Sequence, residues 1–142
     1  MEEFIKKQKD YILISKDTPL ISNLNMMENI SLIKEVNFGM SIKNAQILAN
    51  EFLDKIELSY IGKFRKHQCQ LSDIFFVLLI RALMTKERLV IIKSPYRLLY
   101  TLTDIKNICQ KIDILNSDKD ILILDTLNNK MNYKETICNI IE

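Results

Sequence analysis

The chain has 142 residues, of which 48% are hydrophobic and 27% charged, with a formal net charge of +2. This composition is typical of one globular domain with its own core, and the small net charge gives no electrostatic case for binding nucleic acid or an anionic membrane. Three dispersed cysteines and one histidine lack the spacing of a metal site and favour a reducing cytoplasm. The longest apolar run, residues 74–80, is too short to cross a bilayer, so we expect a soluble protein.

Three segments have the character of β-strands: residues 11–15 (YILIS), 89–93 (LVIIK) and 121–125 (ILILD). Each is a continuous apolar run and does not alternate with polar residues. This pattern is typical of strands that are covered on both faces, as in a parallel sheet.

Helical patterns fill the long stretch between the first two strands. Asn25 is a plausible cap for a helix over residues 26–36, and Ser41 opens an amphipathic helix that runs to Leu58. Ser72 is expected to cap a third helix, residues 72–87, which is apolar almost all round and is therefore predicted to be central.

Two further helices are predicted, from Thr103-Asp104 to Leu115 and over residues 132–141. Strands that alternate with helices indicate a parallel sheet with crossover connections. We therefore predict an α/β fold with a small three-stranded parallel sheet, flanked by helices, in a single domain over residues 1–142. The α/β core comprises residues 10–16 and 87–142, and residues 17–86 form an inserted helical subdomain.

Glycine is scarce: only Gly39 and Gly62 are present. A loop that cradles phosphate needs several glycines close together, because its backbone must turn tightly and present N–H groups to the anion. No GxxxxGK or GxGxxG motif occurs in the 142 residues.

Three stretches together resemble the ATP-binding subunit of ABC transporters. KDTPLISNLNMMENISL is similar to the segment after the family's Q-loop, and QLSDIFFVLLIRALMTKERLVIIKSP is similar to its signature, the following helix and the Walker B strand. DILILDTLNNK resembles the strand that enters the switch histidine. The resemblance extends from about Tyr11 to Met131 and implies an ABC-type P-loop NTPase fold, truncated at its amino terminus so that the Walker A segment is missing.

Carried over position by position, the resemblance places unlike residues where the family has functional ones. The Q-loop glutamine falls on Lys16, and two signature residues are kept as Leu71 and Ser72. The magnesium-binding aspartate falls on Lys93, the catalytic glutamate on Ser94 and the D-loop aspartate on Tyr100. The switch histidine falls on Thr126, or on a neighbour if the register slips. The signature also lacks its glycines. We therefore predict no catalytic residue and no metal site, with the ATP and Mg²⁺ of the family lost, and expect that the protein is not an active enzyme.

The resemblance also implies a surface for a partner, because the family's helical insertion receives a helix of the membrane permease. The candidate docking residues are Leu20, Ile21, Leu24, Met26, Met27 and Tyr60. Packing within the insertion is the alternative role for the same residues.

The sequence thus predicts a catalytically silent ABC-type subunit, cytoplasmic or held at the inner face of the cell membrane. It would act as a structural or regulatory partner of a membrane permease or of a competent ATPase subunit, without binding nucleic acid. The strand edge from Ile121 to Asp125 is expected to be exposed, and open edges invite pairing or must be covered. Either a second chain, as in a homo-oligomer, or the amino-terminal residues Met1–Lys9 would shield it. The alternative function is a free-standing cytoplasmic interaction or anion-binding module that keeps only the fold.

Three local clusters are candidate sites, and a structural role is favoured for each of them. Residues 63–68 (KFRKHQ) are basic, but such runs are usually solvated turns. Lys93, Tyr96, Arg97 and Tyr100 could form a small anion site at the carboxyl edge of the sheet. His67 and Cys69 are two residues apart before a helix, where their side chains would point apart.

Overall fold

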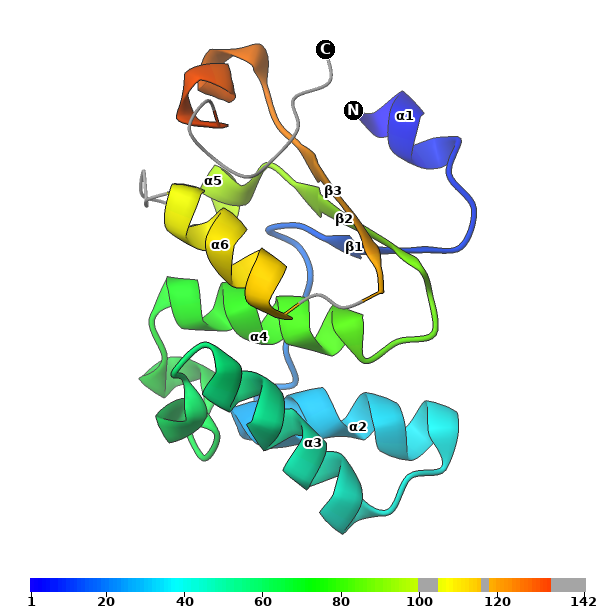
Figure 1. Ribbon diagram of the computed structural model, residues 1–142, viewed down its shortest axis with the longest axis vertical. Helices are drawn as coiled ribbons and strands as arrows, with labels where there is room; N and C mark the ends of the chain where they lie inside the picture. Colours follow the sequence, from blue (N-terminus) through cyan, green and yellow to red (C-terminus); the bar gives the residue numbers. More distant parts are fainter. Residues whose placement is uncertain (100–104, 116–117, 134–142) are drawn as a thin grey trace. The chain divides into compact units, whose positions relative to one another are not determined.

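The computed structural model describes residues 1–99, 105–115 and 118–133 of the chain (Figure 1). These residues divide into two compact units. The sheet unit comprises residues 1–16 with the described residues from 87 onward, and the helical unit comprises residues 17–86. The prediction that residues 1–142 form one domain stays a prediction.

The sheet unit is built on three parallel strands in the order β1-β2-β3. They are β1 (Tyr11–Ile14), β2 (Leu89–Lys93) and β3 (Asp120–Leu124). The middle strand is the most buried, because residues 90–92 are covered on both sides by its neighbours and on both faces. The predicted three-stranded parallel sheet is confirmed, with β1 ending one residue earlier than expected and β3 shifted by one residue towards the amino terminus.

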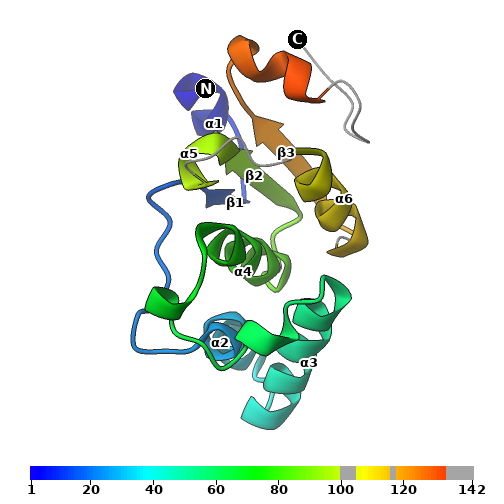
Figure 2. The same ribbon diagram turned by 90° about the vertical axis from the view of Figure 1, so that its left-hand side faces the viewer.

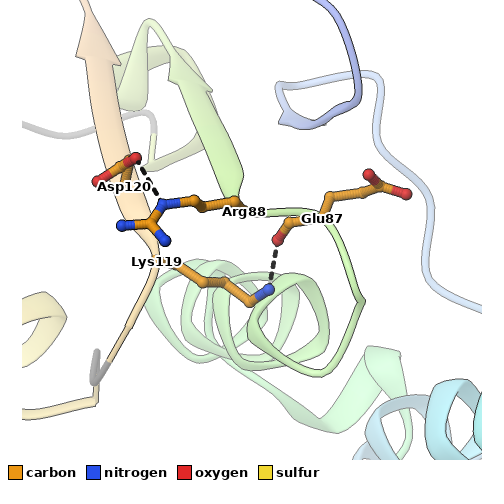
Figure 3. Close-up of polar contacts among 4 residues, drawn as sticks. All are labelled: Glu87, Arg88, Lys119 and Asp120. Atoms are coloured by element: carbon orange, nitrogen blue, oxygen red, sulfur yellow. Dashed lines mark hydrogen bonds and ion pairs between the residues drawn. The ribbon is translucent and has the colours of Figure 1, made fainter.

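Polar contacts at the amino ends of β2 and β3 fix the pairing register of these strands (Figure 3). Arg88 Nε lies 3.2 Å from Asp120 Oδ2, while the Asp120 N–H donates to the Arg88 carbonyl at 2.9 Å. Lys119 Nζ donates to the Glu87 carbonyl. A slip of one residue would break all three contacts and would turn every β3 side chain to the other face.

In the described part of the sheet unit, three helices and one 3₁₀ segment accompany the sheet: α1 (Glu2–Lys6), α5 (Pro95–Leu99), α6 (Ile105–Leu115) and η3 (Leu127–Tyr133). Helix α6 lies next to η3 and buries one face, spaced at three and four residues, as an amphipathic helix should (Figure 2). The predicted start of this helix at 103–104, and most of the helix predicted over 132–141, lie outside the described residues. The short helix α1 was not predicted.

The helical unit contains α2 (Met26–Phe38), α3 (Ile42–Lys55) and α4 (Leu71–Leu83), with 3₁₀ turns η1 (Ser59–Ile61) and η2 (Lys66–Gln68) between the last two. Helix α2 lies against both α3 and α4 (Figure 1). Residues 75–80 of α4 are all buried, which confirms that it is surrounded by other elements. Within the described part of the chain, no helix has the length and apolar character to cross a membrane.

Helix caps confirm two predictions and correct a third. Asn25 and Glu28 form a reciprocal capping box at α2, and Ser41 Oγ accepts from the N–H of the third residue of α3 at 3.2 Å. The prediction that Ser72 caps the third helix is wrong. Helix α4 begins at Leu71 after Gln70, whose N–H donates to Asp73 Oδ2 at 3.1 Å, so Ser72 lies inside the first turn.

Candidate functional site

Lys93, which is half-buried, and Ser94, which is buried, lie at the carboxyl end of β2. The family resemblance expects acidic residues at these two positions. Lys93 Nζ forms an ion pair with the Glu2 carboxylate, which belongs to α1. Helix α1 is anchored by the side chain of Ile5, which is only 5% exposed. Lys93, as donor and as positive charge, lowers the pKa of Glu2 below its ordinary value. The ammonium group therefore has a counter-ion from the same chain.

Ser94 is held in an uncommon backbone conformation directly after the strand. Its φ is +49°, a left-handed value that residues with a side chain seldom adopt, and the residue is buried. The Ser94 N–H donates to the Leu124 carbonyl at 2.8 Å, which extends the β2–β3 ladder by one bond. Ser94 Oγ lies 3.8 Å from Met1 Sδ, so the amino-terminal segment contacts both residues at this end of β2.

The carboxyl end of β3 is organised around Asp125. Its carboxylate accepts hydrogen bonds from the Thr126 N–H at 2.8 Å, from Asn129 Nδ2 at 2.8 Å and from the Tyr133 hydroxyl at 2.7 Å. Burial raises the pKa of Tyr133 strongly, and the hydrogen bond to Asp125 adds to the shift. Burial likewise raises the pKa of Tyr96, and the charge of Asp125 acts in the same direction. The phenols therefore stay neutral, and Tyr133 acts as a donor to a carboxylate.

Four of the seven positions matched to family sites lie at this carboxyl edge, since parallel strands end on the same side. Lys16 is exposed and comes two residues after β1. Lys93 ends β2, with Ser94 directly after it, and the exposed Thr126 follows β3. Leu71 and Ser72 lie in the first turn of α4, in the helical unit. Tyr100 lies outside the described residues, so the anion site suggested for Lys93, Tyr96, Arg97 and Tyr100 stays a prediction.

At the carboxyl edge, the Lys93 ammonium is paired with the Glu2 carboxylate, and the Asp125 carboxylate accepts three hydrogen bonds from neutral donors. Among the described residues, no group of three or more histidine, cysteine, aspartate or glutamate side chains could hold a metal ion. Sequence reasoning missed Glu2 and Tyr133. The contact of Glu2 joins positions 91 residues apart and has no sequence motif. Asp125, by contrast, directly follows an apolar strand and was a signal for a polar cluster.

In the helical unit, the segment that leads into α2 is tied down by the buried side chain of Asn29. Asn29 Oδ1 accepts from the Ile21 N–H at 2.8 Å, and Nδ2 donates to the carbonyls of Ile21, Leu24 and Asn25 at 3.0, 3.3 and 3.0 Å. Asn29 is the middle residue of Glu28-Asn29-Ile30 (ENI), which lies within the first stretch that carries the resemblance. Each of these three residues has a structural role: a capping glutamate, a buried asparagine clasp and the fully buried Ile30.

A second set of contacts holds the same segment from the other side. Arg81 Nη2 donates to the Pro19 carbonyl at 2.8 Å, and burial lowers the pKa of its guanidinium. The first two amides of α2, Met26 N and Met27 N, donate to the carbonyls of Phe64 and Gly62, both at 2.9 Å. These bonds satisfy helix-end groups that would otherwise lack partners, and they bring the η1 turn beside the start of α2.

The candidate docking residues separate by exposure. Leu20 and Met26 are buried, with 8% and 0% of their surface exposed, and Leu24 and Met27 are half-buried. Ile21 and Tyr60 are 42% and 63% exposed. Leu20 and Met26 therefore have a packing role. Of the six candidates, Ile21 and Tyr60 present the most side-chain surface to solvent.

The three-stranded parallel sheet, with a helical unit inserted in the sequence between β1 and β2, defines an α/β fold. No protein-family model and no curated protein matches the chain. Among solved structures it is similar to the dimeric ATP-binding cassette MJ0796 in a post-hydrolysis state bound to ADP and phosphate, with a TM-score of 0.64 and 21% sequence identity. The likeness covers 89% of this chain and 57% of that one, so the chain spans little more than half the length of its counterpart. The predicted ABC-type fold is confirmed.

Proposed function

We propose that this protein is a catalytically silent counterpart of an ABC transporter ATP-binding subunit. It binds a membrane permease or a competent ATPase subunit as a scaffold or regulator, at the cytoplasmic face of the membrane. The observation that carries the proposal is the ion pair of Lys93 with Glu2 at the carboxyl end of β2, where the family resemblance puts a magnesium-binding aspartate.

Electrostatics argue against Mg·ATP at this position. Two unit charges about 4 Å apart interact by roughly 4 kcal/mol at an effective dielectric near 20, and a divalent ion doubles that figure. An ammonium at the metal position therefore replaces a large attraction by a large repulsion. Phosphoryl transfer depends on positioning and charge stabilisation by loop amides, a lysine and Mg²⁺, and the 142 residues contain only two glycines, far apart.

The partner surface in this proposal is the outer side of the helical unit around Ile21 and Tyr60. Both side chains are exposed, and both lie on segments that are hydrogen-bonded to the first turns of α2. An apolar helix of a permease would find a rigid backbone there, with Leu24 and Met27 half-buried behind it. A fixed, partly apolar surface lowers the ordering cost of binding.

Titration of the full chain with Mg·ATP tests catalytic silence. We expect neither saturable heat in calorimetry nor release of phosphate. Saturable binding at micromolar concentration accompanied by turnover would overturn this half of the proposal.

Affinity purification from solubilised membranes tests the partner. We expect recovery of a multi-span membrane protein by the wild-type chain and its loss with Ile21→Ser combined with Tyr60→Ser. The matched control is Ile47→Ser, which removes an apolar side chain of similar exposure from α3. Equal recovery of a membrane protein by all three chains would overturn the proposed surface, and recovery of no membrane protein would favour a free-standing interaction or anion-binding module.

A further inference from the structure

Strand β3 forms one edge of the sheet. Some of its backbone N–H and C=O groups point towards β2, and the others point away from the sheet. At its two ends, the Asp120 N–H donates to Arg88 at 2.9 Å and the Leu124 carbonyl accepts from Ser94 at 2.8 Å, so both residues turn their backbone groups towards β2. Successive residues of a strand in a parallel ladder direct these groups to alternate sides. Leu122 therefore also faces β2, and Ile121 and Ile123 direct two N–H and two C=O groups away from the sheet.

This edge lacks the usual protection against strand addition. Residues 121–124 are Ile-Leu-Ile-Leu, all half-buried, with neither a charge nor a proline among them. Natural edges are commonly blunted by lysine, proline or a bulge, and a flat apolar edge is a template for another strand. In the described residues, β3 pairs only with β2.

We propose that a second copy of this chain pairs with β3 in antiparallel orientation, about a two-fold axis that passes beside Leu122. Ile121 and Ile123 are placed symmetrically about Leu122, so the axis sets Ile121 opposite Ile123 of the second copy, and the reverse. Each such pair exchanges two N–H···O bonds, and all four outward groups of each strand are satisfied. A two-fold contact of this kind uses the same edge of both copies, so assembly stops at the dimer. It joins two three-stranded sheets into one sheet of six strands.

The charges that flank the strand select the same register. One residue beyond the strand on each side, the axis places Lys119 opposite Asp125 of the second copy, twice. Both keep their partners within the chain, Glu87 for Lys119 and Thr126, Asn129 and Tyr133 for Asp125, because an ammonium has three donors and a carboxylate about four acceptor sites. Opposite charges directly across an antiparallel pair stabilise it. A shift by two residues in either direction sets one of these charges opposite an isoleucine. The proposal concerns the sheet edge alone and does not depend on the proposed function.

A proline substitution in β3 tests whether this edge pairs with a second copy, and it leaves the hydrogen bonds between β2 and β3 intact. The Ile123 N–H points away from β2, so Ile123→Pro deletes an outward donor and blocks the edge, while the β2–β3 bonds are kept. By sedimentation velocity we expect a wild-type dimer and a dissociation constant raised about tenfold or more in Ile123→Pro, because two bonds are lost across the axis. Ile123→Val, which keeps the N–H, is the matched control and should dimerise like the wild type.

A cysteine at the axis gives a second readout that does not rely on the proline variant folding. Residues that face each other without hydrogen bonds in an antiparallel pair have Cα atoms about 4.5 Å apart, within the range of a disulfide. Leu122→Cys should therefore form an intermolecular disulfide on mild oxidation, faster than Ile12→Cys on the opposite edge strand. A wild-type monomer, a dimer that persists in Ile123→Pro with native circular dichroism, or equal cross-linking of the two cysteine variants would overturn the proposal.

Discussion

The helical unit and the carboxyl edge of the sheet use their polar side chains differently. In the helical unit, Asn29 and Arg81 bind main-chain atoms of the segment before α2. At the carboxyl edge, side chains bind other side chains: Lys93 binds Glu2, and Tyr133 binds Asp125.

The difference has a physical cause. Main-chain groups are present whatever the sequence, so a segment buried around Asn29 needs a side chain of that shape to satisfy it. A charged side chain at a strand end does not require one particular partner. If its charge changes, a change in one other side chain can supply the opposite charge. At the sheet edge the chain accordingly supplies its own counter-ion for Lys93 and its own donors for Asp125.

Removing the Asn29 side chain should have the largest effect on stability. Asn29→Ala removes the side-chain partner of the Ile21 N–H and of the Leu24 carbonyl, and one of the two donors to each of the Ile21 and Asn25 carbonyls, at a residue that is 2% exposed. We expect a loss of about 2–4 kcal/mol in the free energy of unfolding, measured by urea denaturation. Asn37→Ala on the exposed end of the same helix should cost less than about 0.5 kcal/mol. Equal losses in the two variants would contradict the main-chain role of Asn29.

The sequence predicted the framework well and the edge contacts poorly. The strands could be predicted because short continuous apolar runs between helical patterns are typical of buried parallel strands. Asn25 and Ser41 could be predicted because capping is a local interaction. Ser72 was misassigned because Asp73 competes for the same helix end and reaches back to the N–H of Gln70. The pair of Glu2 with Lys93 depends on the placement of α1 beside β2, which no local pattern encodes.

Tyr133→Phe should have an intermediate effect that depends on pH. Burial and the hydrogen bond to Asp125 raise the pKa of Tyr133, so the folded state keeps the phenol neutral while the unfolded chain ionises above about pH 10. This contribution is complete below that pH and is lost as the pH rises, by at most about 1.4 kcal/mol per pH unit.

Urea denaturation over a range of alkaline pH values measures this effect. The variant should lose about 1–2 kcal/mol at neutral pH, through the missing bond to a carboxylate, and its stability should fall less steeply above about pH 10. Some alkaline dependence remains, because the pKa of Tyr96 is raised as well. Tyr60→Phe makes the same chemical change on an exposed ring and should leave the wild-type profile unchanged. A parallel profile for Tyr133→Phe would show that the phenol does not carry the dependence.

The smallest effect is expected for the ion pair, because both of its side chains are partly open to solvent, 26% for Lys93 and 68% for Glu2. Lys93→Met should release α1 without unfolding the sheet, so amide exchange should accelerate in residues 2–6 and stay slow in β2. Acid should have the same result in the wild type. The pKa of Glu2 is lowered, so its contribution is present above the ordinary carboxyl pKa and is lost as the pH falls through the lowered value. Lys86→Met, on an exposed lysine of the helical unit, is the control. Unchanged exchange of α1 in Lys93→Met would mean that Ile5 alone holds the helix, and that the lysine at the end of β2 has no counter-ion in solution.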